Sequence, residues 1–311
     1  MSGMQFEDLS QLAVLDRDGL NESFHHGVAV LVDPNGNILE SHGNISAPMY
    51  PRSALKPVQA LAMRKLGLSL PEKEAILSMA SHHGTKEHTD LVLAILQGQD
   101  LGVEDLQCPS DLPWNAAAKA TATSSSLHMN CSGKHAGFLA TAKLNGFDTK
   151  NYLSIDHPVQ VAAKALVEEL SGETVTKTTL DGCGAPLFAI STLGLAKAIS
   201  GFVQLAQEQV AWAMQHPHLI GDVQTPDAAF LRAGLFSKLG AEGVFTVATT
   251  SGYALAIKIA DGSLRAAPEI AIRLLEKQGL ISDSQAAEVR KTTQVESLGG
   301  GKVVGGLTAS F

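Results

Sequence analysis

The sequence predicts a mixed fold of the α/β (α+β) class, in which an antiparallel sheet is flanked by helices. β-Branched runs lie near both ends of the 311-residue chain, at 27–32 and at 244–259, and helix start and stop signals fill the segment between them. We expect strands from the two ends to pair in one sheet, which gives a fold of high contact order. The chain has no repeat, linker or low-complexity segment, so one domain over residues 1–311 is the simplest interpretation.

The strand predictions depend on apolar runs and on the turns that follow them. Residues 27–32 are mostly valine, alanine and leucine, the turn 33–37 contains proline, asparagine and glycine, and a return strand follows at 38–43. This pattern predicts a hairpin. Two further runs, at 243–249 and 254–259, have the same pattern near the other end of the chain.

Helical patterns with recognisable ends account for most of the remaining chain. They cover residues 51–66, 71–81, 87–97, 133–144, 157–170, 187–203, 204–214 and 267–278. Residues 105–127 are rich in proline, serine and threonine, which indicates a long loop over the surface or over a site. A strand candidate at 174–180 runs into the turn 181–186, and a glycine-rich turn at 299–306 precedes a last strand.

The composition excludes several classes of protein. Hydrophobic residues make up 45% of the chain and charged residues 17%, which is typical of a compact globular protein. The net charge is -8 and no block of lysine or arginine occurs, so nucleic acid and anionic membranes are not expected partners. The first residues lack the features of a signal peptide, and no apolar run reaches the roughly 18 residues of a membrane helix. We therefore expect a soluble, cytoplasmic protein.

Ser53 and Lys56 are the first candidate catalytic pair. They stand three residues apart at a predicted helix start, so their side chains share one face, and a partly desolvated lysine can take the proton of a serine hydroxyl. The alternative is a helix-capping serine beside a surface lysine, and spacing alone favours that alternative. Ser81 follows an apolar helix in a short polar turn, where a helix-terminal polar residue is the simpler interpretation.

Lys258 stands inside the predicted strand 254–259, on the same face as two alanines. A buried lysine there would need a partner or a lowered pKa, whereas an edge lysine would reach solvent. His82, His83 and His88 form a cluster whose spacing does not fit one helical face, and we expect polar loop residues there.

The cysteines suggest a metal site. Their number, three, argues against a disulfide framework in a reducing compartment. Cys131 and Lys134 are three apart at a helix start, where a thiolate is favoured, and Cys183 lies between two glycines. Two thiolates suit zinc, but the spacing matches no zinc ribbon or finger, and spacing alone favours two buried apolar cysteines. Cys108 has no assigned role.

Four motifs together resemble a known family. They are PRSALKP at 51–57, ASH at 80–82, NCSGKH at 130–135 and DGCGAP at 181–186. In order and approximate spacing they resemble the signature stretches of the rhizobial-type L-asparaginases, the inducible, thermolabile asparaginase II class. That class is unrelated to the threonine-dependent bacterial enzymes and to the plant-type enzymes with an N-terminal nucleophile. The resemblance covers essentially the whole chain.

The resemblance implies a fold similar to serine β-lactamases, penicillin-binding proteins and serine-dependent glutaminases. It also implies a homodimer that hydrolyses L-asparagine with two Ser-Lys pairs. Carried over by motif, the pairs are Ser53 with Lys56 and Ser81 with Lys258, of which Lys258 matches only by its strand.

The family also binds zinc through two cysteines and a lysine, which are Cys131, Lys134 and Cys183 here, with water completing the shell. His135 and Asp181 fall where the family keeps supporting residues. From the residues themselves, we expect Asp181 to hold His135 or the substrate ammonium. We expect Arg52 to pair with the substrate α-carboxylate.

The expected chemistry is attack of a lysine-activated serine on the side-chain amide of asparagine, with Ser53 favoured over Ser81 as the nucleophile. Zinc would either polarise and position the substrate or stabilise the fold. Three alternatives stay open. A β-lactamase or peptidase shares Ser-x-x-Lys, but the late strand has no Lys-Thr-Gly. A glutaminase shares both fold and chemistry, and a non-enzymatic zinc protein needs only the cysteines.

Overall fold

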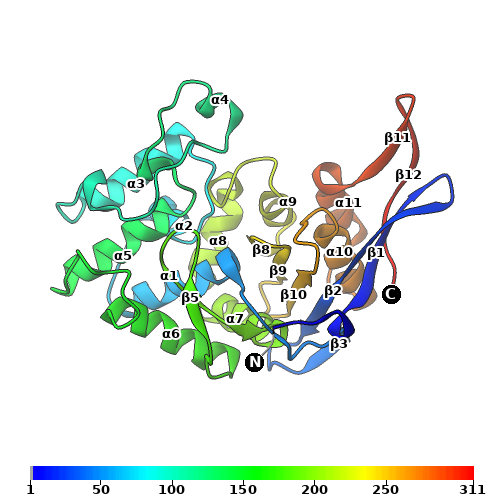
Figure 1. The fold of residues 1–311 in the computed structure, drawn as a ribbon, viewed down its shortest axis with the longest axis horizontal. Helices are drawn as coiled ribbons and strands as arrows, with labels where there is room; N and C mark the ends of the chain where they lie inside the picture. Colours follow the sequence, from blue (N-terminus) through cyan, green and yellow to red (C-terminus); the bar gives the residue numbers. More distant parts are fainter. Residues whose placement is uncertain (1–2) are drawn as a thin grey trace.

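The computed structural model describes residues 3–311, and an antiparallel sheet is its central element (Figure 1). The strand order is β11-β12-β1-β2-β10-β9-β8, with β3 beside β2. The strands are β1 (Ser10–Arg17), β2 (Leu20–Val32), β3 (Ile38–His42), β8 (Phe236–Gly240), β9 (Val244–Ala248), β10 (Ala254–Ile259), β11 (Glu296–Gly299) and β12 (Lys302–Ala309). All neighbours are antiparallel, which confirms the predicted class.

Strand β2 pairs with strands from both the early and the late part of the chain. Val30 lies opposite Ala256 of β10 on one side and opposite Ser41 of β3 on the other, so the predicted hairpin and the predicted long-range pairing are both confirmed. Strands β1, β8 and β11 were not predicted, and the predicted turn 299–306 is too long, because β12 already begins at Lys302. One edge of β2 is paired with β1 along residues 20–27 and with β3 along residues 29–32, whereas the other edge is paired with β10 along residues 27–32.

The helices divide into two groups around this sheet. They are α1 (Lys56–Lys65), α2 (Glu72–Ser78), α3 (Lys86–Gln97), α4 (Ala116–Lys119), α5 (Ser132–Leu144), α6 (Pro158–Ser171), α7 (Thr192–Leu205), α8 (Gln207–Gln215), α9 (Pro226–Arg232), α10 (Ala267–Lys277) and α11 (Asp283–Thr293). Figure 1 shows α1–α6 gathered at one end of the molecule, with β1, β2, β11 and β12 at the other.

Two hydrophobic cores lie on the two faces of the sheet. Val30 and Val32 belong to the core shared with α1 and α7, whereas Ala29 and Leu31 belong to the core shared with α10. This alternation follows from the period of two in a strand. It explains why residues 27–32 form a continuous apolar run, since both faces of β2 are covered.

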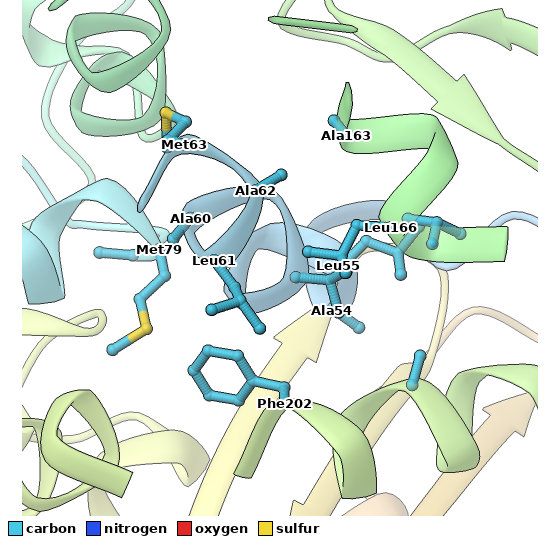
Figure 2. Close-up of a cluster of buried hydrophobic side chains, with 14 of the residues drawn as sticks. Ala54, Leu55, Ala60, Leu61, Ala62, Met63, Met79, Ala163, Leu166 and Phe202 are labelled. Carbon is cyan, nitrogen blue, oxygen red and sulfur yellow. The ribbon is translucent and has the colours of Figure 1, made fainter. Parts of the chain in front are cut away.

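Helix α1 lies at the centre of the larger core. Every residue from Lys56 to Met63 is buried. Figure 2 shows the side chain of Leu61 directed toward Phe202 of α7, with Leu55 and Leu166 of α6 close to each other. Removing a fully buried leucine side chain costs roughly 2–5 kcal/mol. The packing therefore holds α1, and with it Lys56 at the start of the helix, in one position.

The predicted helix 187–203 begins too early. Residues 186–191 form two short strands, β6 (Pro186–Phe188) and β7 (Ile190–Ser191), which pair with β5 (Thr178–Leu180) and β4 (Pro48–Met49). The helix begins only at Thr192 because the Ser191 hydroxyl accepts a hydrogen bond from the N–H of Gly194 at 2.9 Å and caps it. Helices α9 and α11 were not predicted.

Among residues 3–311, none of the helices combines the length and apolar character needed to cross a bilayer. The expected cytoplasmic location and the single domain over residues 1–311 stay predictions, and residues 1 and 2 lie outside the described part of the chain.

Candidate active site

Ser53 lies in η2 (Arg52–Leu55), a 3₁₀ turn that leads directly into α1. The backbone N–H of Lys56 donates to the carbonyl of Ser53 and joins the two elements. Strand β8 packs against this turn so closely that a Cβ on Gly240 would lie 2.5 Å from the carbonyl oxygen of Pro51. Only glycine fits there, and the contact fixes the serine turn against the edge of the sheet.

Arg52 has an unusual backbone. Its φ of 55° lies in the left-handed region, where a residue with a Cβ is strained. The arginine Nε donates to Oδ1 of Asp181 at 2.7 Å, and the same oxygen accepts from the N–H of Gly182 at 2.9 Å. Two residues expected to bind the two ends of the substrate are therefore paired with each other. Within residues 3–311, Nη1 and Nη2 of Arg52 make no other hydrogen bond.

Lys56 brings three of the sequence motifs together. Its buried amine donates to the carbonyl of Ala80 at 2.5 Å, to the hydroxyl of Ser81 at 3.1 Å and to the carbonyl of Asn130 at 3.4 Å. Ser81 is itself 4% exposed, and its backbone N–H donates to Ile220. The structure thus places Lys56 and Ser81 in direct contact at the end of α1.

The Ser53 side chain is half-buried, and its hydroxyl has no hydrogen-bond partner in the part of the chain that the structure describes. Ser53 precedes Lys56 by three residues at the junction of η2 and α1, and Lys56 is the residue that contacts Ser81. A half-buried serine hydroxyl that is not engaged elsewhere remains accessible to a substrate.

Lys258 is not paired with Ser81 as the resemblance implied. Its amine donates to the carbonyls of Glu242 at 2.7 Å and Ile259 at 2.6 Å, and burial lowers its pKa. It lines a cavity of about 530 Å³ that also contains Arg52. The reason is its place in the sheet, since β9 separates β10 from β8, the strand that meets the serine turn.

The lysine that the sequence reasoning missed is Lys238 of β8. It is fully buried, lies 3.3 Å from Oδ2 of Asp227, and donates to the carbonyl of Leu239 at 2.9 Å. It stands two residues before Gly240 and so shares the strand face that meets the serine turn. Burial lowers the pKa of Lys238 to about 8, and Asp227 opposes this shift. The sequence signal that could have identified Lys238 is the Lys-x-Gly pattern at 238–240. It was missed because the strand that carries it is too short to be recognised from its pattern of apolar residues.

The three predicted metal ligands lie together. Cys131 precedes α5 as its N-cap, Lys134 is in the first turn of α5, and Cys183 belongs to the 181–186 turn; all three are buried. The Lys134 amine lies 3.3 Å from the Cys183 sulfur. A hydrogen bond from Cys131 and the charge of Lys134 hold the pKa of Cys183 well below its usual range.

The donor set fits a metal such as zinc. Within residues 3–311 no group of three or more His, Cys, Asp or Glu side chains could hold an ion, so a site here depends on the Lys134 amine. Two thiols and an amine suit a borderline-soft cation. The neighbouring His135 is fully buried; its Nδ1 lies 2.8 Å from the hydroxyl of Tyr152, and its ring is close enough to Cys183 to lower the pKa of that thiol. Zinc itself stays a prediction.

The histidine cluster is not a set of solvated loop residues. His82 is fully buried; its Nδ1 accepts from the N–H of Gly84 at 3.1 Å, which assigns the ring proton to Nε2, 2.8 Å from the hydroxyl of Ser132. That hydroxyl then donates to the carbonyl of Leu127 at 2.9 Å. Burial keeps the pKa of His82 well below its usual range, so a neutral imidazole links the Ser81 turn to α5.

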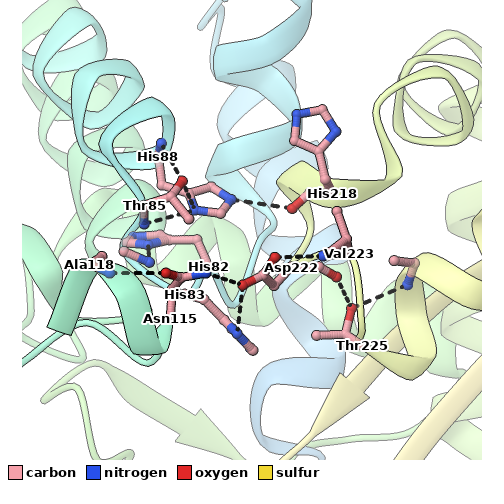
Figure 3. A network of polar contacts seen from close by, with 12 residues as sticks. His82, His83, Thr85, His88, Asn115, Ala118, His218, Asp222, Val223 and Thr225 are labelled. Carbon is pink, nitrogen blue, oxygen red and sulfur yellow. Dashed lines mark hydrogen bonds and ion pairs between the residues drawn. The ribbon is translucent and has the colours of Figure 1, made fainter. Parts of the chain in front are cut away.

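His83 belongs to a second network, shown in Figure 3. Its Nδ1 lies 3.5 Å from Asp222, and Asn115 donates to the same carboxylate at 2.8 Å. The backbone N–H of Asn115 also donates to the carbonyl of His83 at 2.9 Å. Asn115 therefore fastens the long loop 105–127 to the turn that carries Ser81, which agrees with a loop lying over a site.

Comparison with known proteins gives a family match along almost the whole chain. Residues 13–309 match the model of the L-asparaginase II family. No curated protein matches at a significant level. Among solved structures, the chain is similar to a β-lactamase from Mycobacterium bovis, with 18% identity, a TM-score of 0.44, and coverage of 81% of this chain and 94% of the other.

It is also similar to a protein named Mglu, with 12% identity, a TM-score of 0.35, and coverage of 82% of this chain and 67% of the other. These two likenesses are distant, whereas the family match spans all four motifs and every residue of the site described above. The chain belongs to the L-asparaginase II family, as its motifs predicted.

Proposed function

We propose that the protein hydrolyses the side-chain amide of L-asparagine to aspartate and ammonia by Ser-Lys catalysis. Membership of the L-asparaginase II family supports an amidohydrolase of this kind. The observation that carries the mechanism is the buried amine of Lys56, which follows Ser53 by one helical turn and contacts the hydroxyl of Ser81 at 3.1 Å. On this basis we assign Ser53 as the nucleophile, Lys56 as the base and Ser81 as the proton relay.

In the proposed reaction Ser53 is the nucleophile. Lys56, in its neutral form, takes the hydroxyl proton as the Ser53 oxygen bonds to the amide carbon. The C–N bond then breaks, and the proton passes from Lys56 through Ser81 to the departing nitrogen, which leaves as ammonia. Water hydrolyses the resulting aspartyl ester with the same residues in reverse roles.

The substrate's two charged ends need partners. We propose that Arg52 binds the α-carboxylate, because Asp181 occupies only its Nε. Asp181 is the carboxylate available to the α-ammonium. The pair would thus contact opposite charges on one small zwitterion, and each of its members is already oriented by the other.

Cys131, Lys134 and Cys183 would hold a zinc ion, with the buried His135 beside Cys183. The chemistry supplied there by a bound zinc ion is Lewis-acid polarisation or positioning of the substrate. Binding requires the Lys134 amine to be deprotonated, so metal affinity should fall at low pH. We further propose a homodimer, which size-exclusion chromatography with light scattering would test.

The experiment is ammonia release from asparagine and from glutamine. We expect Ser53→Ala to lose activity by several orders of magnitude and Ser81→Ala to lose less, because a relay can be replaced by water. Ser284→Ala, an exposed serine on α11, is the matched control. Full activity in both Ser53→Ala and Ser81→Ala would exclude the mechanism, and a preference for glutamine would reassign the substrate.

A further inference from the structure

Asp227 is a fully buried carboxylate whose role no motif indicated. It lies in the first turn of α9 and faces β8. Its Oδ1 accepts from the hydroxyl of Ser237 at 2.9 Å, and its Oδ2 lies 3.3 Å from the amine of Lys238. All three side chains are completely inaccessible to solvent. Because water cannot screen the interaction, the Asp227 carboxylate acts strongly on the charge of the Lys238 amine.

The other groups that face Lys238 do not favour its charged form equally. Lys56 of α1 repels an ammonium whenever it is itself protonated, and His83, in the turn after α2, interacts with Lys238 at longer range. Cys131, before α5, would help only as a thiolate. Asp227 is the carboxylate in direct contact. Burial lowers the pKa of Lys238 to about 8, and Asp227 is the largest opposing influence.

The carboxylate in contact with the amine of Lys238 favours a cation over a base. Lys238 lies 3.3 Å from Oδ2 of Asp227 and donates to the carbonyl of Leu239 at 2.9 Å. Lys238 also lies on the strand face of Gly240, the residue in contact with the serine turn. A fixed positive charge beside the nucleophile stabilises negative charge that develops on the substrate during attack.

We propose that Asp227 is a positioning residue that keeps Lys238 in its ammonium form beside the Ser53-Lys56 pair, and thereby sets the highest pH at which the site works. The proposal rests on the proposed function. Ser237 holds the other carboxylate oxygen without contributing charge, which makes it the matched control for orientation alone.

The test is the pH dependence of kcat/KM for asparagine, measured on the protein in the same metal-loaded state throughout. Asp227→Asn keeps the shape and removes the charge, so the alkaline limb moves to lower pH, and a shift of one pH unit lowers activity on the order of tenfold at high pH. Asp227→Glu keeps the charge, so the alkaline limb returns toward its wild-type pH. The substrate amino group titrates identically for all variants, so only differences between them are compared.

Two further variants complete the kinetic test. Ser237→Ala leaves the limb where it is in the wild type. Lys238→Arg, which stays charged at every accessible pH, moves the limb upward. The proposal is overturned if Asp227→Asn leaves the alkaline limb unmoved, if it moves the acid limb instead, or if Ser237→Ala shifts the limb equally.

A measurement without substrate separates this proposal from the proposed function. A lysine with a lowered native pKa binds more protons in the unfolded state, so stability rises with pH between the native and the unfolded pKa. For the wild type this rise begins near pH 8, and for Asp227→Asn it begins lower. If the pH dependence of stability is the same for the wild type and Asp227→Asn while the wild type hydrolyses asparagine, the role of Asp227 is overturned and the proposed function is not. A wild type without amidase activity overturns the proposed function, while the unfolding curves still decide whether Asp227 holds the charge on Lys238.

Discussion

The amine of Lys56 lies 3.1 Å from the hydroxyl of Ser81, and no carboxylate within residues 3–311 lies within ion-pair distance of that amine. Its other contacts are the backbone carbonyls of Ala80 and Asn130. The lysine therefore interacts only with neutral oxygens, one of which can exchange a proton. Lys238, by contrast, faces the carboxylate of Asp227. The two buried lysines of this site therefore differ in their surroundings: only Lys238 is in contact with a carboxylate.

Replacing Lys56 with methionine should abolish amide hydrolysis while leaving the fold intact. Methionine fills much of the same buried volume but cannot accept a proton, so we expect kcat to fall on the order of 10²- to 10⁴-fold. The thermal midpoint should change by only a few degrees. Lys291→Met, at an exposed position on α11, controls for the loss of a lysine, and a Lys56→Met enzyme with near-normal kcat would contradict the assignment.

The approach of β8 to the serine turn can be tested at Gly240. A methyl group there would lie 2.5 Å from the carbonyl oxygen of Pro51 and 3.2 Å from the backbone nitrogen of Ala54, and neither backbone atom can swing aside. Gly240→Ala should therefore cost about 1–3 kcal/mol in the free energy of unfolding and lower activity by displacing Ser53. Urea denaturation and ammonia release measure the two effects. Gly3→Ala, whose Cβ would make only an ordinary contact at 3.8 Å, should have neither.

Metal content should depend on Cys183 and not on Cys108. Both thiols are buried, but Cys108 lies outside the ligand set, and burial raises its pKa to about 12. We expect Cys183→Ala to lose bound zinc, measured by elemental analysis after purification, because a thiolate ligand is removed. Cys108→Ala should keep it. Equal zinc content in the two variants would argue against the Cys131, Lys134 and Cys183 site.

The backbone of Arg52 predicts an inverted order of stability for two small substitutions. At a φ of 55°, Arg52→Gly should be about 1 kcal/mol more stable than Arg52→Ala, although both lose the contact with Asp181. At Val161, an exposed position within α6, the order should be the usual one, with alanine more stable. Urea titrations of the four variants give the comparison. The same order at both positions would mean that the Arg52 backbone is not strained.

The parts of the fold that the sequence predicts are those with a strong local pattern. The 27–32 run and the strand 254–259 were recognised because almost all their residues are apolar, and the predicted pairing of strands from the two chain ends is confirmed by the register of β2 with β10. Most helices were recognised from their caps. The strands at 186–191 were missed because their apolar residues continue directly into α7, and only the cap at Ser191 separates the two.

The candidate site was predicted where a motif is contiguous and missed where it depends on tertiary contact. Lys238 lies in a five-residue strand with a serine and a lysine at its centre, which has no clear alternation. Lys258 lies in an obvious strand and attracted the assignment instead, although its position in the sheet directs its amine to Glu242. The burial of His82 depends on Ser132 and Gly84, and no spacing rule connects those three residues.

The pairing of β2 with β10 has a consequence for synthesis of the chain. A ribosome releases β2 early, but the strand that covers one of its edges is made only after all the helices of the large core. Until then β2 presents an apolar strand with an unpaired edge, the kind of segment that associates with other chains. The newly made protein therefore passes through a vulnerable interval, and its yield of folded protein should improve when a chaperone shields the first strands.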